Sequence, residues 1–424
     1  MLRKVFLIIT AVCLVACPGL ARAGETDLLV QKLVEKGILS PNEAQILLDE
    51  TKQDVAKQNA KGTNDAVPSW VQTVKLKGDM RARYQLDVDK NQKNENRGRL
   101  RMRLGLEAKP NDQMMVGVGI ASGNTGDPRS TNSTWGSSGT ANVPGGTSAL
   151  DLDYAYGQYK PVPEVTLTAG KFKNPLWQPN DMIWDTDLNP DGLAAQLNYS
   201  VAPGIDAYMN SMLFVMYESR TADYSDPLML AVQPGFNLAV SDAIGLNAAV
   251  TYYQNNNIGN RATFASTKST NTIVGGKYVY NYNAVNPSAE LSFNNLFGDT
   301  FLPYIALSGD YICNTSMAKG NSGRDGWDAG FKFGDKKVGA KGQWQGKLIY
   351  ARLGRDAFLD NFPDSDRYNG KTNMKSWEGI LEYGLGKNTS LALDYYYAQS
   401  LTYPTGLTTT NPQQVLQVDW NLKF

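Results

Sequence analysis

The sequence predicts an all-β fold, a transmembrane antiparallel β-barrel of about sixteen strands, preceded by a short α-helical segment at the N-terminus. Three observations lead to this prediction. Apolar and polar side chains alternate with a period of two over most of the chain after Trp70. Short turns alternate with long polar loops. After the first 23 residues, no apolar run reaches the roughly 18 residues that a membrane-spanning helix needs.

The composition excludes several functional classes. The 424 residues contain no histidine, so Ser-His-Asp hydrolysis, His-ligated zinc or haem, and histidine acid–base chemistry are excluded. We therefore expect no enzyme, no cofactor and no metal ion. Lys plus Arg and Asp plus Glu are both 41, and removing three basic residues with the first 23 positions leaves 38 against 41. This balance is not that of a nucleic-acid-binding protein.

Residues 1–23 have the pattern of an export signal: a basic start, an apolar stretch and a cleavage site with small residues that ends at Ala23. A second interpretation is a lipoprotein-type cleavage that would leave a lipidated Cys17. Either cleavage takes the protein out of the cytoplasm. Cleavage after Ala23 leaves Cys313 as the sole cysteine of the mature chain, so no intramolecular disulfide is expected.

Residues 24–69 are predicted to form a periplasmic helical segment followed by a polar linker. The sequence Ser-Pro-Asn-Glu at 40–43 supplies an N-cap, a proline at the first helical position and a capping-box glutamate. The apolar positions on either side fit a helical hairpin that packs on itself or an oligomer-forming coiled coil. The barrel is expected to occupy residues 70–424.

The alternation is clearest in residues 97–109. Arg99, Arg101 and Arg103 share one face of this predicted strand, while leucines and a methionine occupy the other. A membrane barrel turns the leucines toward lipid and the arginines toward water. The preceding strand repeats the pattern, and its basic residues are Lys75, Lys77, Arg81 and Arg83. Further alternating segments are residues 193–199, 244–252, 327–333 and 391–397.

The connections and the aromatic residues add further signals. Short turns are expected at 110–112, 161–164, 203–204, 241–243 and 386–388, and long loops at 122–149, 173–191, 255–275 and 356–375. Outer-membrane barrels have this rhythm of periplasmic turns and outer loops. Aromatics near strand ends are predicted to form the interfacial girdles; they are Trp70, Tyr84, Tyr154, Tyr156, Tyr199, Trp377 and Tyr383.

The final segment, residues 413–424, reads QQVLQVDWNLKF and places apolar residues on one face up to the terminal phenylalanine. It resembles the closing strand of bacterial outer-membrane barrels, which ends in an aromatic residue that the barrel-insertion machinery reads. More narrowly, the chain resembles the putative porin family, which joins a short helical segment, here LLVQKLVEKGILSPNEAQILLDE, to a porin barrel. The resemblance implies an insertion signal at Trp420, Leu422 and Phe424, location in the outer membrane of a Gram-negative bacterium, contact with its lipid, and a homotrimer.

The resemblance also implies a function. A porin passes small hydrophilic solutes or ions by passive diffusion, and its selectivity is set at the narrowest point by lining charges and an inward loop. The basic wall would be Lys75, Lys77, Arg81, Arg83, Arg99, Arg101 and Arg103. In general porins the third loop folds inward, which points to residues 173–192 and to the acids Asp181, Asp185, Asp187 and Asp191.

Other interpretations fit the same residues. The arginines could serve only to pair with carboxylates of the last strands, such as Asp394 or Asp419, and the loop aspartates could serve only to form turns. Trp177 and Trp184 either stack on sugars or pack the loop against the wall. The alternative functions are a substrate-selective channel for anions, phosphate or sugar, and a structural tether or adhesin.

Overall fold

The computed structural model describes residues 40, 44, 68–89, 93–123, 127–136, 149–218, 225–261, 270–298, 302–402 and 412–424. The predicted signal segment and nearly all of the predicted helical segment lie outside the described residues. The chain divides into two compact units, Met1–Gln72 and Thr73–Phe424. The 3-10 helix η1 (Ser69–Thr73) precedes the first strand.

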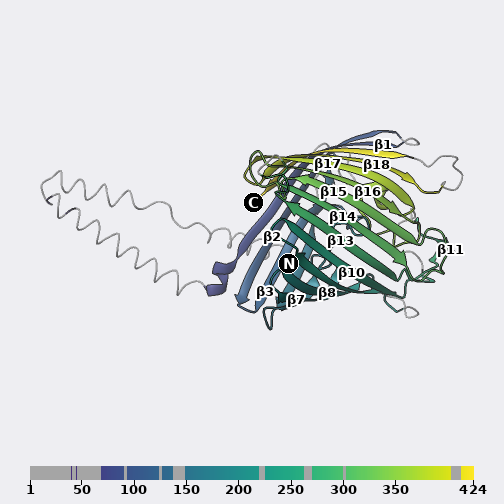
Figure 1. Ribbon diagram of the computed structural model, residues 1–424, viewed down its shortest axis with the longest axis horizontal. Coiled ribbons are helices and arrows are strands. Elements are labelled where there is room, and N and C mark those ends of the chain that lie inside the picture. The colour runs from purple at the N-terminus through teal and green to yellow at the C-terminus, as the bar shows by residue number, and fades with distance from the viewer. Residues whose placement is uncertain are drawn as a thin grey trace. The chain divides into compact units, whose positions relative to one another are not determined.

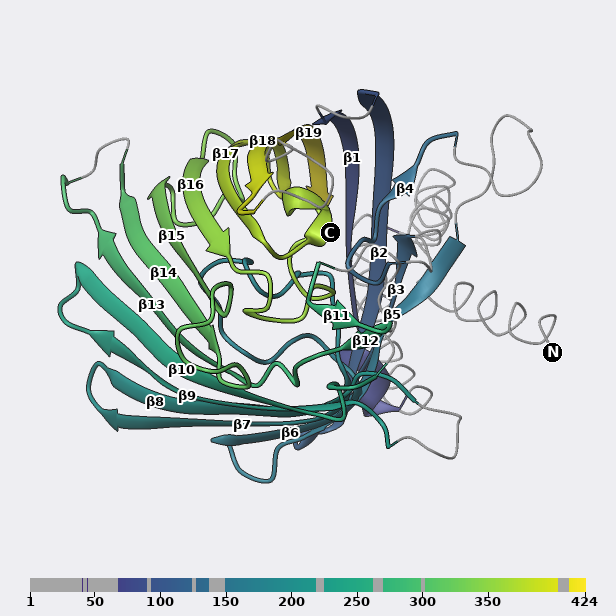
Figure 2. The same cartoon turned by 90° about the vertical axis from the view of Figure 1, so that its right-hand side faces the viewer.

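The second unit is a closed antiparallel β-barrel (Figures 1 and 2). Its sheet has 17 strands within the described residues, one of which is the two-residue β4 (Ser133–Thr134), so the barrel wall has sixteen, as the sequence predicts. The wall strands are β1 (Lys75–Asp89), β2 (Glu95–Asn111), β3 (Met114–Gly123), β5 (Ala149–Tyr159), β6 (Val165–Lys171), β7 (Asp191–Ala202), β8 (Ile205–Val215), β9 (Leu228–Ala239), β10 (Ile244–Asn256), β13 (Ala284–Asn294), β14 (Tyr304–Asn314), β15 (Asp325–Gly334), β16 (Trp344–Leu353), β17 (Met374–Gly386), β18 (Thr389–Ser400) and β19 (Gln413–Lys423).

The first and last strands close the ring. β1 pairs with β2 along one edge and with β19 along the other, in a register that places Tyr84 opposite Val418 and Met80 opposite Leu422. Closure gives every strand two hydrogen-bonded neighbours. A sheet in lipid requires this, because no water is available there for an open edge.

The two faces of the wall differ in polarity: the outward face is apolar and the inward face carries polar side chains, as a membrane barrel requires. Outward side chains are apolar and exposed, as for Leu193 (56% exposed) and Leu348 (50%). Inward side chains include Gln233, Thr251 and Asn286, which are fully buried although they are polar. The alternation in the sequence therefore marks a lipid face and an interior face, as predicted.

Connections at the two ends of the barrel differ in length. Short turns at 112–113, 203–204 and 387–388 lie at the end where β1 begins and β19 ends. Long connections such as 257–283 and 354–373 lie at the opposite end, called here the long-loop end. The long connection 257–283 contains a small hairpin of β11 (Ile273–Val274) and β12 (Lys277–Tyr278). The other contains the 3-10 helix η2 (Arg367–Gly370).

Two long loops, 172–190 and 354–373, fold into the ring. Figure 2 looks into the ring and shows loop segments crossing its interior. Trp184 of one loop and Phe358 and Phe362 of another are buried in one apolar cluster with inward strand residues such as Met212 and Tyr253. The ring centroids of Trp184 and Phe362 lie 4.8 Å apart. The packing interpretation of Trp184 thus matches its position, and part of the interior has a true hydrophobic core.

Two aromatic residues differ from the sequence prediction. Tyr154 and Tyr156 were predicted for the interfacial girdle, but both point inward and cover glycines of β3, so that a Cβ added to Gly119 would lie 2.3 Å from the Tyr154 ring. The cause is a register shift between β3 and β5 next to Gly119, where Asp153 is the additional residue. A bulge of one residue reverses which face the following side chains occupy.

No helix among the described residues is long and apolar enough to cross a membrane.

Candidate functional site

The basic residues of β1 and β2 lie side by side on the interior face. The register of the two strands places Arg81 opposite Arg101 and Arg83 opposite Arg99. Like charges directly opposite each other in a sheet repel, so this arrangement requires nearby carboxylates. The structure provides carboxylates from strands and from loops.

Two aspartates of the wall pair with these arginines. Asp419 on β19 accepts two hydrogen bonds from Arg83, at 2.7 Å from Nε and 2.8 Å from Nη2. Asp79 on β1 bridges two arginines, at 2.8 Å from Nη2 of Arg101 and 2.7 Å from Nε of Arg103. The bidentate contact with Asp419 fixes the guanidinium plane of Arg83 against the wall, and Asp79 holds Arg101 and Arg103 side by side. The pairing of arginines with Asp419, considered as an alternative from the sequence, is present.

The loop at 172–190 crosses the barrel interior and reaches the same wall. Trp177 exchanges hydrogen bonds with Gln233 on β9, and Asn180 donates to Asp328 on β15 at 2.7 Å. Asp187 then approaches β2, where its Oδ1 lies 3.0 Å from Nη1 of Arg103. Because these strands belong to different parts of the ring, the loop spans its interior, and it brings one carboxylate to the arginines.

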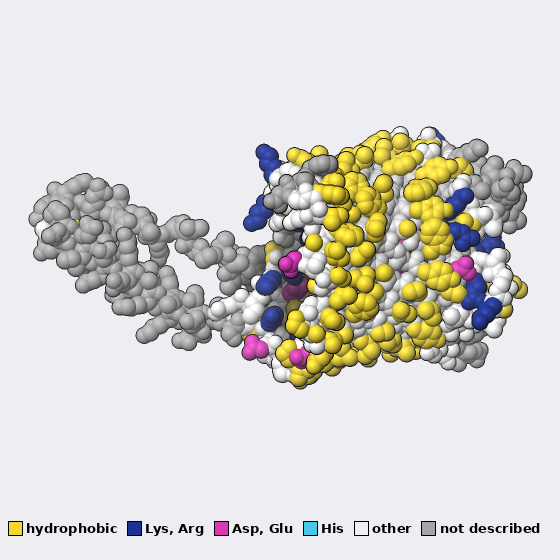
Figure 3. Space-filling view, in the orientation of Figure 1, with side chains coloured by type: hydrophobic (Ala, Val, Ile, Leu, Met, Phe, Trp, Pro, Cys, Tyr) yellow, Lys and Arg dark blue, Asp and Glu magenta, His cyan; other side chains and the backbone are white. Residues whose placement is uncertain are grey.

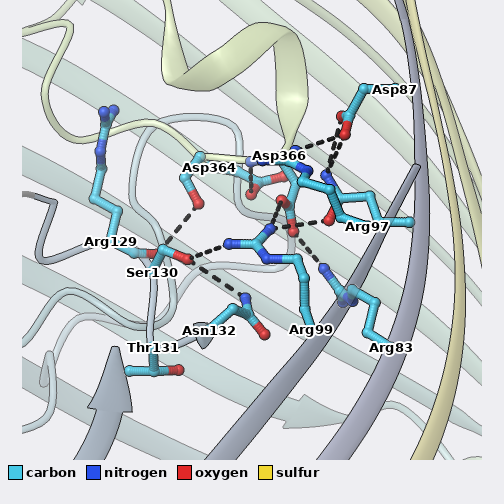
Figure 4. Close-up of polar contacts among 12 residues, drawn as sticks. Arg83, Asp87, Arg97, Arg99, Arg129, Ser130, Thr131, Asn132, Asp364 and Asp366 are labelled. Carbon is cyan, nitrogen blue, oxygen red and sulfur yellow. Dashed lines mark hydrogen bonds and ion pairs between the residues drawn. The ribbon is translucent and has the colours of Figure 1, made fainter. Parts of the chain in front are cut away.

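A second loop carboxylate comes from 354–373. Asp366, next to η2, lies 2.9 Å from Nη1 of Arg83 and 3.8 Å from Nη1 of Arg99. Figure 4 shows Arg99 between Asp366 and Ser130. Burial alone would raise the pKa of Asp366, but the charges of Arg83 and Arg99 lower this pKa to about 2. Asp366 is therefore a fixed negative charge at neutral pH.

A third segment, 127–134, lies beside these two loops. Asn132 accepts a hydrogen bond from Arg81 at 2.7 Å, and the Thr131 hydroxyl donates to Asp187 at 2.9 Å. Arg129 reaches into the 354–373 loop, where its Nη1 lies 2.9 Å from the carbonyl oxygen of Gly370 and 3.3 Å from those of Asp360 and Pro363. Three loops are thus held together next to the arginine wall.

The remaining predicted loop acids have other partners. Asp181 accepts from Arg367 of η2 at 2.8 Å, and this arginine lowers the Asp181 pKa against the effect of burial. Asp185 is buried and accepts from the backbone N–H groups of Asp187 and Ser365. Burial and the nearby Asp187 charge raise the pKa of Asp185 to about 8, so it is largely protonated at neutral pH.

The outer members of the predicted set lie away from this network. The Asp191 side chain is 59% exposed and pairs with Lys171 on β6 at 3.1 Å. Lys77 pairs with Glu107 on β2 at 2.5 Å, and Lys75 is exposed with its Cα opposite that of Glu107. Of the four loop aspartates expected from the sequence, only Asp187 contacts a predicted wall arginine within the described residues.

The predicted insertion residues lie at the closing seam. Trp420 is 44% exposed and Phe424 is 59% exposed. The Phe424 backbone exchanges hydrogen bonds with Gly78 of β1, and its ring lies where a Gly78 side chain would be. Glycine at this position therefore makes room for the terminal ring.

The arginine wall is a charge-balanced network. Among the described residues, six arginines of β1 and β2 (Arg81, Arg83, Arg97, Arg99, Arg101 and Arg103) contact six carboxylates, which are Asp79, Asp87, Glu95, Asp187, Asp366 and Asp419. Such a network creates a strong local field with little net charge. The described residues contain no cluster of three or more Cys, Asp or Glu side chains arranged to hold a metal ion.

Sequence reasoning missed several members of this site. Asp366 and Arg129 lie in loops that were recognised as long, but no local pattern separates them from ordinary loop charges. Asp79 lies two residues before Arg81 and so shares its face of the strand, and this alternation was the available signal. Arg367 is fully buried in the interior, paired with Asp181 and Glu378, and only the fold reveals this position.

Comparison with known proteins identifies the class of this barrel. The family described as "Putative porin" matches residues 87–298 and 278–424. A high-pH structure of Pseudomonas putida OprB is 12% identical and covers 84% of this chain and 95% of that chain, with a TM-score of 0.53. At this identity the likeness extends to the fold alone.

A variant of the Rhodopseudomonas blastica porin is 11% identical and covers 83% of this chain and all of that one, with a TM-score of 0.42. No curated protein matches the chain. The family match covers the barrel from the end of β1 to the C-terminus, and the chain therefore belongs to the putative porin family of bacterial outer-membrane diffusion channels.

Proposed function

We propose that this protein is a passive porin for small hydrophilic solutes and ions, with its narrowest point at the arginine wall of β1 and β2. The observation that carries the proposal is the meeting of this wall with Asp187 and Asp366, which come from two different inward loops. Charges on a wall and on a facing loop are the usual determinants of selectivity in such channels.

The charge balance of the network decides between two kinds of channel. A channel selective for anions or phosphate needs an excess of positive charge along the path. Here each wall arginine contacts a carboxylate. The electric field therefore points across the channel, and the net charge of the network is close to zero. The network therefore favours modest ion selectivity over a dedicated anion channel.

The proposal extends to the assembly of the protein. We propose that the signal segment is cleaved after Ala23 and that residues 24–69 form a periplasmic helical segment. We also propose that the barrel inserts through its terminal strand, with Trp420, Leu422 and Phe424, and forms a homotrimer in the membrane. These features are supported by the sequence pattern and by family membership.

A liposome swelling assay tests passive diffusion. Purified full-length protein in liposomes should admit uncharged solutes at rates that fall smoothly with solute size and rise linearly with concentration. Liposomes without protein supply the baseline. Saturation at low concentration would point to a substrate-selective channel, and an absence of flux from folded barrels would favour the tether or adhesin.

One observation favours a sugar-selective channel as the second candidate. Tyr154 and Tyr156 point inward with ring centroids 5.7 Å apart and lie on a floor of glycines. Both rings are partly exposed, and the ion pairs Lys77–Glu107 and Lys173–Asp153 lie beside them. Aromatic faces flanked by both signs of charge suit neutral rings that carry hydroxyl groups.

The two candidates differ in the permeation of glucose and of sorbitol, a linear polyol of similar size. Preference for glucose that disappears in a Tyr154→Leu, Tyr156→Leu variant would support sugar selectivity. Equal rates for the two solutes, unchanged by the substitutions, would support simple diffusion.

A further inference from the structure

The outward face of β14 to β17 has a group of basic residues near the long-loop end, called here the lipid-facing basic patch: Arg324, Arg352 and Lys375. Arg352 is the second-to-last residue of β16, and Lys375 is the second residue of β17. Arg352 and Lys375 point outward because side chains alternate along a strand. Leu348 shares the face of Arg352 on β16 and is 50% exposed, and Trp377 shares the face of Lys375 on β17 and is 58% exposed. The patch is outside the barrel interior and independent of the proposed pore.

Arg352 and Lys375 face each other, and a carboxylate is in ion-pair contact with neither of them within the described residues. The register of β16 and β17 pairs them directly. Within the described part of the chain, neither side chain makes an ion pair. Opposed like charges destabilise a strand pair. The opposed arginines of β1 and β2 are ion-paired with carboxylates. Arg352 and Lys375 have no such ion pair within the described residues, which leaves a position for an anion from outside the chain.

The third basic residue extends the patch across β14 and β15. The Arg324 guanidinium lies against the outward Cys313 side chain of β14, with Nη2 2.8 Å from Sγ. Asp325 begins β15 on the same face as Trp327, so three cations are accompanied by one carboxylate. Figure 3 shows mainly basic side chains at the right-hand edge of the apolar band, with an acidic side chain among them.

An aromatic row fixes the depth of the patch in the membrane. Trp327 lies opposite Arg352 on the neighbouring strand, and Tyr350 and Trp377 lie one step further from the long-loop end. The ring centroids of Trp327 and Tyr350 are 5.2 Å apart, and those of Tyr350 and Trp377 are 4.8 Å apart. Clustered Trp and Tyr residues on a lipid face mark the level of the headgroups. The basic residues are therefore at the height of lipid headgroups.

We propose that the lipid-facing basic patch binds the phosphate groups of a phosphorylated lipid headgroup in the outer leaflet. Long loops of such barrels face the exterior, which places the patch in that leaflet. Arginine presents a fork that matches phosphate oxygens, and a phosphate between Arg352 and Lys375 would convert their repulsion into two attractive contacts. The acyl chains of the same lipid would lie along the apolar band below the aromatic row.

Thermal unfolding of the full-length protein in non-ionic detergent tests the proposal. The probes are bisphosphorylated lipid A, the same lipid without phosphates, and inorganic phosphate. We expect only the phosphorylated lipid to raise the melting temperature strongly. An Arg352→Gln, Lys375→Gln variant should need about 25-fold more of this lipid for half of the maximal shift, at about fivefold per charge.

The matched control is Lys337→Gln, Lys341→Gln, which removes two exposed charges from the turn at the other end of the same β15–β16 hairpin. This control should respond like the wild type. Without lipid, the Arg352→Gln, Lys375→Gln variant should melt no lower than the wild type, because a repulsion has been removed. If that variant does not fold, Lys375→Gln alone should show about a fivefold change.

Three results would overturn the proposal. They are an unchanged lipid response in both patch variants, an equal response to the lipid without phosphates, and an equal response to inorganic phosphate alone. The last result would indicate a site for free anions rather than for a lipid.

Discussion

At the scale of single residues, Arg83 shows how the wall holds charge. It is 5% exposed, bound by both oxygens of Asp419 and contacted by Asp366 at 2.9 Å. A buried ion pair contributes modestly when intact, because desolvation offsets most of the attraction. Removing one partner is expensive, about 3–5 kcal/mol, because it leaves a buried charge without compensation. Asp419, on the neighbouring strand β19, therefore holds Arg83 in place. Asp366, on a loop, adds a second negative charge beside Arg83 and so changes the net charge of the site.

The change Asp366→Asn keeps the shape of the side chain and removes one negative charge from the loop side of the site. A unit charge about 4 Å away in water is worth about 1 kcal/mol, or roughly a fivefold change in an equilibrium constant. We therefore expect the anion-to-cation permeability ratio to rise up to about fivefold, as measured by reversal potential under a salt gradient. Because the Asp366 pKa is about 2, the difference from wild type should persist from pH 7 down to pH 4.

The matched control for Asp366→Asn is Asp191→Asn. The Asp191 carboxylate is exposed and pairs with Lys171, outside the arginine network. Equal shifts of the permeability ratio in the two variants would show that the charge of Asp366 affects ion selectivity no more than an exposed charge outside the arginine network.

Asp185→Asn should have a different pH dependence. Its folded pKa of about 8 lies above the ordinary value of 3.8, so the folded state holds a proton that the unfolded chain has lost. Stability therefore falls as pH rises toward 8, and Asn should reduce this fall while leaving ion selectivity at pH 7 unchanged. Melting temperatures at pH 6 and pH 9 measure the effect. A large change of selectivity at pH 7 would mean that Asp185 is ionised there.

At the scale of elements, the three inward loops act as one unit fixed to the wall. The 172–190 loop contacts β9, β15 and β2, and the 354–373 loop adds Phe358 and Phe362 to the interior core. The wall strands are joined to one another by their own hydrogen-bonded ladders, to which these loops contribute no strand. The loops therefore depend on the barrel more than the barrel depends on them.

Arg129→Met tests the connection between loops. Methionine keeps the length of the side chain but loses the hydrogen bonds to the carbonyl groups of the 354–373 loop. We expect noisier single-channel currents and faster proteolysis within 354–373, with little change in the melting of the barrel. Arg355→Met, an exposed position in the same loop, is the control. A quiet channel with unchanged proteolysis would show that Arg129 does not hold the loop.

The sequence predicted most elements but not all their orientations. Alternation located the β1 and β2 arginines on one face correctly, because the period of two depends only on strand geometry. The same reasoning failed at Tyr154 and Tyr156, because a one-residue bulge at Asp153 has no signature in local composition. Asp366 could not be assigned either, since its role depends on the path of a long loop through the interior.

At the scale of the whole molecule, closure depends on the seam between β1 and β19. Eleven Cα pairs join these strands, from Asp79 opposite Lys423 to Asp89 opposite Gln413. The terminal strand and the membrane class were predictable from sequence because lipid imposes a strict pattern on every outward residue. The strand number followed from the same regularity.

Deleting Phe424 tests the terminal residue. Its backbone adds the last hydrogen bonds to Gly78, and its ring covers that glycine. We expect a marked loss of folded barrel in outer membranes, measured by the heat-dependent mobility of the protein in gel electrophoresis. Phe424→Tyr, which keeps an aromatic ring, should behave like the wild type. Normal yields of the truncated protein would contradict the proposed insertion signal.

We propose above that the arginine wall of β1 and β2 is the selective constriction of an open porin. Single-channel conductance and reversal potential in a planar bilayer, compared between wild type and the Arg99→Ala, Arg101→Ala, Arg103→Ala variant, test it most directly. We predict stable conductance steps with modest ion selectivity in the wild type, and a clear shift toward cations with larger conductance in the variant. Identical conductance and selectivity in the two folded proteins would contradict the claim.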